Sequence, residues 1–387
     1  MNVPVINGLR ALAILGVVWH HVIGPQFLPG HHPMIIGSLV LPANPLGSNG
    51  WFGVNLFFFL SGFVLYLPYA TGQRVFASAE SIRAFWGHRA RRLLPLFYLS
   101  LIVGVAMTNA GGLVRIAGLG RLAVALAGLF TFLPWTFNPI GNWVLWSLGV
   151  ELLFSAAFPQ IVAFTARRGI WRTLLLSIAV SLAVRVIGQE LFNADRSYHN
   201  FVSDNIFGRT DDFVWGMVCA HLYSIGRLPR AWIFLPCGLG LLLASAVLSD
   251  AWYVGELPIW TQAFTYDVFD VGAFLITCGL LARNGWVARL LEARVLQVLG
   301  MMCFSIYVWH GVLLLRVFPG GTTEQPLQNL LPYFPVYLGL LLAISALTYR
   351  FVEFPNRELR ALFLLGPRAF AGAGRFAGRT DTGSPSA

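Results

Sequence analysis

Apolar segments long enough to cross a membrane recur along this sequence from one end to the other. A helix needs about 20 mostly apolar residues to cross the ~30 Å hydrocarbon core of a bilayer. Hydrophobic residues make up 57% of the chain and charged residues only 11%, which leaves no stretch for a separate soluble domain. The predicted spans lie roughly at 8–25, 51–69, 93–109, 143–164, 172–190, 208–225, 231–249, 263–282, 297–317 and 332–351. The sequence therefore predicts an all-α, polytopic integral membrane protein with about ten transmembrane helices.

The positive charges indicate how these spans are oriented. All 26 basic residues are arginine, and they gather in the connections at 71–92, 167–172, 227–230 and 283–294. Basic connections favour the cytoplasmic side of a membrane, so both termini are expected in the cytoplasm. In a soluble protein the net charge of +10 would suggest a nucleic-acid partner. Here contacts with anionic lipid headgroups explain the charge, and no nucleic acid is expected.

One further apolar segment, at 122–136, disturbs this arrangement. If it crossed the membrane, every later arginine cluster would move to the outer side. Pro134 and Pro139 would break a helix here, so we expect a re-entrant or interfacial segment instead. The prediction is one transmembrane domain over residues 1–355. A cytoplasmic tail follows over 356–387, and its small and polar residues are typical of disorder.

Arg10 and His21 are the first candidates for function. They lie on the first span, and in a helix their spacing brings them to within about 20° of one face, about 16 Å apart along the axis. Polar groups inside an apolar helix are costly and need a partner or a ligand. Arg10 would lie at the cytoplasmic entrance and His21 near the midplane, where a neutral imidazole could take a proton from a hydroxyl. His20 points about 100° away and is expected to have a structural role.

Small and basic residues of the next spans give further candidates. Ser61 and Gly62 interrupt an aromatic span, which indicates either close helix packing or a slot for an elongated apolar arm. Arg89 and Arg92 would share one face if their segment is helical. Clustered guanidinium groups at a membrane face suit either lipid headgroups or the phosphates of a nucleotide.

Acidic and basic side chains also occur inside later spans. Glu151 ends the stretch 146–151 and has no neighbouring cation in the sequence. It could orient His21, bind a sugar hydroxyl, or pair with an arginine such as Arg185. Arg209 is followed by two aspartates at the start of a span, where it could close a polar network or contact an acceptor.

The last spans hold two more motifs. His310 ends the stretch Ser305-Ile306-Tyr307-Val308-Trp309-His310, and Arg350 and Glu353 have the spacing of a local ion pair. The four cysteines are isolated, and no metal-ligand spacing, phosphate-binding glycine loop or dinucleotide fingerprint occurs. We therefore expect no bound metal and no permanently bound cofactor.

Together these stretches resemble the membrane acyltransferase-3 family. Arg10 and His21 match the family's Arg-(ten residues)-His motif, and Arg89 and Arg92 match its Arg-x-x-Arg element. The stretches 146–151 and 305–310 match its Trp-Ser-Leu-x-Val-Glu and Ser-x-Tyr-x-Trp-His stretches, although Gly149 stands where many relatives have serine. With the small-residue element at 61–63 and the closing segment at 349–355, six matches follow the family's order, which is more specific than any one of them.

The resemblance implies an O-acyltransferase of a bacterial inner membrane. It would take an acyl group, most often acetyl, from cytoplasmic acetyl-CoA and transfer it to a hydroxyl of a cell-surface or lipid-linked glycan. It implies His21 as general base or transient acyl carrier, Arg10 near the donor and Glu151 as an orienting group. Arg89, Arg92 and Ser61 would bind the donor, and Trp146, Ser147, Arg209, Tyr307 and His310 would bind the acceptor.

Several alternatives stay open at this point. The acceptor could be a small metabolite such as an antibiotic, and the acyl chain could be longer than acetyl. His21, Glu151 and His310 could also form the proton relay of a transporter or flippase. A non-enzymatic membrane partner could retain the same fold. Some relatives have an esterase-like domain after the last span, and the residues after 355 are too few to encode one.

Overall fold

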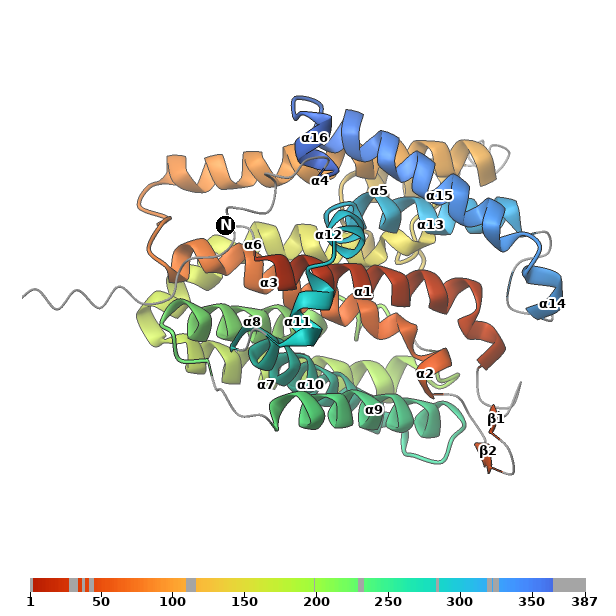
Figure 1. The fold of residues 1–387 in the computed structure, drawn as a ribbon, viewed down its shortest axis with the longest axis horizontal. Coiled ribbons are helices and arrows are strands. Elements are labelled where there is room, and N and C mark those ends of the chain that lie inside the picture. Colours follow the sequence, from red (N-terminus) through yellow and green to blue (C-terminus); the bar gives the residue numbers. More distant parts are fainter. Residues whose placement is uncertain are drawn as a thin grey trace, which may run out of the picture.

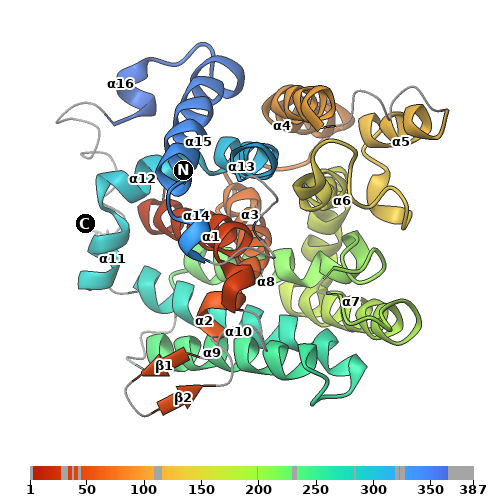
Figure 2. The same ribbon diagram turned by 90° about the vertical axis from the view of Figure 1, so that its right-hand side faces the viewer.

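The computed structural model describes residues 3–27, 34–36, 39–41, 45–108, 116–197, 199–228, 233–282, 285–318, 322 and 327–364. Its long helices run side by side along one direction, and an end-on view places α1 and α3 among the other helices at the centre of the bundle (Figures 1 and 2). The long helices are α1 (Pro4–Val22), α3 (Gly53–Ala70), α4 (Ala79–Thr108), α6 (Trp146–Arg168), α7 (Ile170–Phe192), α8 (Ile206–Ser224), α9 (Phe234–Tyr253), α10 (Gln262–Ala282) and α15 (Phe334–Thr348).

The predicted all-α membrane fold is confirmed. Eight helices among the described residues are long and apolar enough to cross a membrane. A ninth, α8, has a similar length of 19 residues but contains Arg209, Asp211 and Asp212. The remaining predicted span, 297–317, corresponds to the pair α12 (Arg294–Met301) and α13 (Cys303–Val317).

A continuous helix over 297–317 is a wrong prediction, because α12 and α13 are bent by 70° at the break between them. The two helices have different packing partners: α12 packs on α1, and α13 packs mainly on α15. Gly300 of α12 lies directly against the backbone of Asn7, where an added Cβ would lie 1.9 Å from the carbonyl oxygen. One straight helix could not satisfy both contacts.

The segment predicted to be re-entrant or interfacial does not form a long helix. α5 (Ile116–Leu126) has 11 residues and is followed by short 3-10 turns at Phe130–Phe132 and Trp143–Leu145. At 1.5 Å per residue α5 extends about 16 Å, about half the thickness of a hydrocarbon core. The remaining short elements are α2 (Pro45–Ser48), α11 (Trp286–Leu291), α14 (Leu327–Leu330), α16 (Leu359–Leu362) and the antiparallel hairpin of β1 (Met34–Ile36) and β2 (Leu39–Leu41).

The arginine-rich connection predicted at 71–92 is helical over much of its length. α4 already begins at Ala79, where the Ser78 hydroxyl accepts a hydrogen bond from the Ser81 amide at 3.3 Å and caps the helix. With 30 residues, α4 is about 45 Å long, longer than a bilayer core requires. Arg89 and Arg92 therefore lie on one helical face, as predicted for a helix.

Glycines bring α3 and α8 into direct backbone contact. A Cβ added at Gly62 would lie 1.9 Å from the backbone oxygen of Phe213, and one added at Gly216 would lie 1.8 Å from that of Phe59. Small residues allow two helix backbones to approach this closely. The packing interpretation of Gly62 is therefore confirmed, while the neighbouring Ser61 faces a cavity.

The ion pair predicted between Arg350 and Glu353 is wrong. The chain forms a π-helical turn over Tyr349–Glu353, which changes the spacing at which side chains lie above one another. Arg350 donates to the carbonyl oxygens of Phe354 at 3.2 Å and Pro355 at 2.6 Å, whereas Glu353 accepts from the Ser305 hydroxyl. Residues 365–387, most of the predicted tail, lie outside the described residues.

Candidate active site

An inner cavity lies among α1, α3, α4, α6 and α13, with about 810 Å³ of open space. It brings together most of the side chains predicted to form the site, namely Arg10, Ser61, Arg89, Arg92, Ser147, Glu151 and Tyr307. Apolar and aromatic side chains complete the wall, among them Val54, Phe57, Phe58 and Phe304. Cys303 also lines the cavity and was not among the predicted site residues. The cavity therefore combines a cationic part with an apolar part.

An outer chamber of about 1460 Å³ adjoins this cavity. Arg10, Arg89 and Arg92 line both spaces, so these three side chains lie where the two adjoin. Arg74, His88 and Arg357 also line the outer chamber, and none of them was a predicted site residue. Their only sequence signal was a position in basic segments next to the spans.

The charges around the inner cavity are only partly compensated. Arg89 Nη2 lies 2.6 Å from Glu151 Oε1, and Arg89 Nε donates to the Ser155 hydroxyl at 3.0 Å. Ser61 donates to the same carboxylate oxygen at 3.4 Å. Among the described residues, neither Arg10 nor Arg92 forms an ion pair. The cavity therefore has an excess of positive charge.

Glu151 is thus paired with an arginine, which was one of the alternatives left open by the sequence. The partner is Arg89 rather than Arg185, because α6 packs beside α4 at this depth. Glu151 forms no hydrogen bond with His21 in the described structure. An orienting role of Glu151 toward the base is therefore not supported by this geometry, and its carboxylate positions Arg89 instead.

His21 contacts His310, which no sequence pattern predicted. Nδ1 of His21 lies 3.1 Å from Nε2 of His310, and the ring centroids are 5.0 Å apart. Trp143 packs edge-on against His21 with a centroid separation of 4.7 Å. His310 is fully buried, whereas His21 is partly exposed.

The hydrogen bonds of this pair define which nitrogen of His21 is free. Nδ1 of His310 lies 2.5 Å from the carbonyl oxygen of Tyr307, which can only accept, so His310 has its proton on Nδ1. In neutral His310, Nε2 then has a lone pair, and Nδ1 of His21 must donate to it. Nε2 of a neutral His21 is therefore unprotonated, as a general base requires.

Tyr307 connects the inner cavity with the histidine pair. Its hydroxyl lies 2.6 Å from the Ser147 hydroxyl and donates to the Val144 carbonyl at 2.7 Å. Tyr307 lines the cavity, and its ring centroid lies 5.3 Å from that of His310. The order from the arginines of the cavity is therefore cavity, Tyr307, His310 and His21.

His20 packs edge-on against His21 with ring centroids 5.0 Å apart but has a different hydrogen-bond partner. Its Nδ1 lies 2.8 Å from the backbone oxygen of Ser48, on the segment that precedes α3. A carbonyl oxygen only accepts, so His20 donates to it and joins two parts of the fold.

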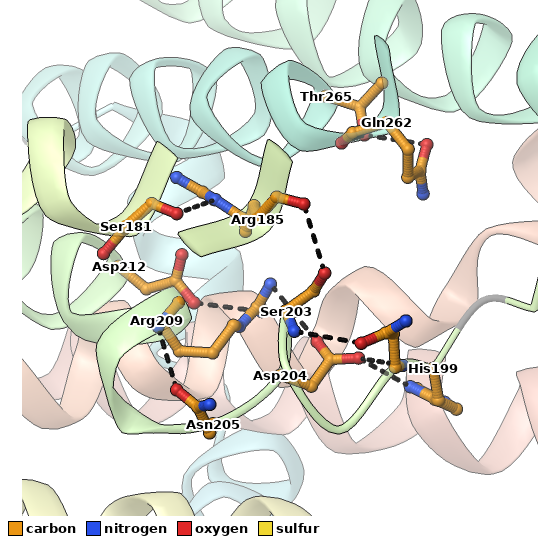
Figure 3. A network of polar contacts seen from close by, with 12 residues as sticks. Ser181, Arg185, His199, Ser203, Asp204, Asn205, Arg209, Asp212, Gln262 and Thr265 are labelled. Atoms are coloured by element: carbon orange, nitrogen blue, oxygen red, sulfur yellow. Dashed lines mark hydrogen bonds and ion pairs between the residues drawn. The ribbon is translucent and has the colours of Figure 1, made fainter. Parts of the chain in front are cut away.

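Three predicted acceptor-binding residues, Trp146, Arg209 and His310, line neither cavity, and neither does His21. Trp146 is buried, with Phe137 at 5.6 Å and His199 at 4.9 Å between ring centroids. Arg209 is buried and lies 2.9 Å from Asp212 and 3.9 Å from Asp204 (Figure 3). Of the two alternatives for Arg209, the structure shows the polar network, although Nε and Nη1 of Arg209 have no hydrogen-bond partner among the described residues. Arg209 is 1% exposed and lines neither cavity, so direct contact with an acceptor is not supported.

Comparison with known protein families gives a match over most of the chain. Residues 3–350 match a family described as an acyltransferase domain, type 3. The chain belongs to the acyltransferase-3 family. The resemblance of the motifs is thereby confirmed. The transporter and non-enzymatic alternatives have no comparable support.

Relatives of this acyltransferase include O-acetyltransferases of Staphylococcus aureus. The O-acetyltransferase OatA of strain NCTC 8325 is 22% identical over 382 residues, covering 92% of this chain and 57% of OatA. SACOL0978 of strain COL, which has a provisional O-acetyltransferase name, is 22% identical over 387 residues with the same coverage. The chain thus spans little more than half the length of these relatives. No solved structure matches it.

Substitution of His310 tests the arrangement of the histidine pair. His310→Phe removes the acceptor for Nδ1–H of His21, and we expect kcat for acetyl transfer to fall by about 10²-fold or more as the tautomer and ring orientation are lost. His310→Gln retains an oxygen that can accept this hydrogen bond and is expected to recover at least part of the activity. Steady-state kinetics with labelled acetyl-CoA would measure both variants. Equal activities of the two would contradict a positioning role for His310.

Proposed function

We propose that this acyltransferase transfers an acetyl group from cytoplasmic acetyl-CoA to a hydroxyl of a cell-surface or lipid-linked glycan. It would do so in the inner membrane of a bacterium, with both termini in the cytoplasm. The names of the relatives support O-acetyl transfer. The observation on which the proposal mainly rests is the cavity with three arginines, two of which have no ion-pair partner among the described residues.

Acetyl-CoA fits the charge and shape of this space. The larger outer chamber, with its additional arginines, suits the phosphates of the nucleotide because guanidinium groups bind phosphate in bidentate fashion. The narrower inner cavity, with Val54, Phe57 and Phe304, suits the elongated arm that ends in the thioester. Arg10 and His21 on α1 are separated by about 16 Å along the helix axis, so the arm would extend toward the histidine pair.

The chemistry then follows from the free nitrogen of His21. Nε2 takes the proton of the acceptor hydroxyl as its oxygen forms a bond to the thioester carbonyl carbon. The carbon–sulfur bond breaks, and the proton passes from His21 to the leaving thiolate. Alternatively, Nε2 attacks the thioester first and holds the acetyl group before the hydroxyl accepts it. An acetyl-histidine trapped with donor alone would support the two-step route.

Arg92→Gln tests the donor site. Arg92 lines both spaces and has no ion pair whose loss would disturb the fold. The loss of a charge-assisted contact, about 1.5–3 kcal/mol, is expected to weaken CoA binding by about 10–150-fold in calorimetric titration of the purified protein. Arg91→Gln is the matched control, because Arg91 is an exposed neighbour on α4 that lines neither space. Unchanged CoA affinity of Arg92→Gln would argue against the assignment.

The acceptor is tested separately. Mass spectrometry of surface and lipid-linked glycans from a deletion strain should show the loss of one acetyl increment, restored by the wild-type gene but not by the His21→Ala variant. Unchanged glycans, together with loss of acetylation on a small metabolite, would favour the metabolite as acceptor. A lost increment larger than acetyl would identify a longer acyl donor.

A further inference from the structure

An acidic cluster lies between α7, α8 and α10, and neither cavity includes it. Five aspartates share this region with two arginines, Arg185 and Arg209. Asp211, Asp212, Asp270 and Arg185 are each 0% exposed, and Arg209 is 1% exposed. If all these groups are ionised, five negative and two positive charges leave an excess of three negative charges. The other two aspartates are Asp204 and Asp267.

Four of these aspartates form ion pairs with the two arginines. Arg185 bonds to Asp211 and lies 3.2 Å from Asp267. Arg209 lies between Asp212 and Asp204, as Figure 3 shows. No ion pair remains for Asp270 among the described residues.

Asp270 is the exception within the cluster. Neither of its carboxylate oxygens accepts a hydrogen bond from any residue that the structure describes. Nevertheless, three carboxylate oxygens lie within 4.8 Å of one another, one each from Asp211, Asp212 and Asp270. A buried carboxylate without a partner is costly, and two further carboxylates beside it raise that cost. Its neutralisation requires either a proton shared with the neighbouring Asp212 or a positively charged species that protein side chains do not supply.

We propose that Asp211, Asp212 and Asp270 bind one divalent cation of the hard, oxygen-preferring class, such as Ca²⁺ or Mg²⁺. Carboxylate oxygens are the ligands that these ions prefer. Oxygens on opposite sides of a Ca²⁺ ion lie about 4.6–5.2 Å apart, which is compatible with the observed spacing. A charge of +2 would reduce the excess of negative charge in the cluster from three to one. The ligands come from α8 and α10, too far apart in the sequence for a spacing motif to reveal them.

Cation binding would also support the site described above. Asp211 and Asp212 lie on α8, which packs against α3 through Gly216, and Ser61 of α3 lines the inner cavity. Through Arg209 and Asp204 the cluster continues to His199, 3.6 Å from Asp204, whose ring packs on Trp146 next to Ser147. The cation would thus fix α8 against α10 behind the wall of the cavity.

The test uses the full-length protein in detergent after treatment with a chelator. Titration with CaCl₂, MgCl₂ or MnCl₂ is expected to raise the melting temperature in a saturable manner, by about 5 °C at a hundredfold excess over Kd. Elemental analysis after desalting should show about one bound ion per chain. Asp270→Asn should abolish both effects. In chelator it should be at least as stable as wild type, because a charge without a partner has been removed.

Asp250→Asn is the matched control, since Asp250 is a buried carboxylate of α9 that accepts hydrogen bonds from Ser48 and Asn49 outside the cluster. It should retain the cation-dependent shift. The proposal is overturned if the wild type retains no divalent ion and its melting temperature does not respond to any of the three salts. Shared protons would then neutralise the carboxylates. If Asp270→Asn does not fold, the metal content and thermal shift of the wild type still decide the question.

Discussion

Replacing His21 with alanine is expected to lower acetyl transfer from acetyl-CoA by about 10²–10⁴-fold, the usual contribution of a general base. Nε2 of His21 is the unprotonated nitrogen of the pair, because Nδ1 of His21 donates to His310 and His310 donates to the Tyr307 carbonyl. The loss should appear in kcat, while CoA binding, which depends on the arginines of the cavity, should change little. Transfer of labelled acetyl to endogenous acceptor in isolated membranes would measure the first quantity, and calorimetry the second.

His20→Ala is the matched control for this experiment. The two histidines are adjacent and their rings pack edge-on with centroids 5.0 Å apart, but His20 hydrogen-bonds to the Ser48 carbonyl at 2.8 Å, whereas His21 hydrogen-bonds to His310. Its loss removes one hydrogen bond, worth about 0.5–1.5 kcal/mol of stability, and should leave kcat within a few-fold of wild type. Wild-type transfer by His21→Ala, or an equal loss in both variants, would refute the assignment of His21 as base.

The second large effect concerns stability. Gly62→Ala is expected to destabilise the fold by at least about 3 kcal/mol, because overpacking of a close contact forces a backbone shift. The added Cβ would lie 1.9 Å from the backbone oxygen of Phe213, which cannot rotate away as a side chain could. Thermal unfolding followed by tryptophan fluorescence in detergent, together with the yield of monodisperse protein, would measure this loss.

Gly339→Ala provides the comparison. Gly339 also lies within a long helix, α15, but an added Cβ there meets nothing within 4 Å. Alanine is the better helix former, so this variant should be as stable as wild type or slightly more stable. If both variants unfold at the wild-type temperature, the α3–α8 contact is looser than the structure indicates.

Much of the candidate site was predictable because its motifs are local and follow the family's order. Arg10, Ser61, Arg89, Arg92, Ser147, Glu151 and Tyr307 were all selected from sequence, and all line one cavity. The same motifs predict Trp146 and Arg209 on the acceptor side, but both lie in buried contacts away from the cavity. A polar residue in a span can equally serve packing or charge neutralisation, and only its neighbours distinguish these roles.

The partners of the charged groups could not be predicted. Glu151 pairs with Arg89 across 62 residues, and His21 contacts His310 across 289 residues. Such contacts depend on which helix faces meet and on the relative position of the two helices along their axes. One close backbone contact, such as that at Gly62, fixes this relative position for all side chains of the two helices.

The sequence by itself determined the all-α membrane fold with its repeated apolar helices and the face that Arg10 and His21 share on α1, and it predicted a re-entrant or interfacial segment at 122–136, where the structure has no long helix. These properties follow from apolar length, helical period and charge placement, which act within a single segment. The tertiary structure alone decided the bend between α12 and α13, the tautomer of His21 and the unpaired carboxylate of Asp270. Each of these depends on contacts between helices distant in the chain, where burial removes water as an alternative partner and leaves geometry to select which groups meet.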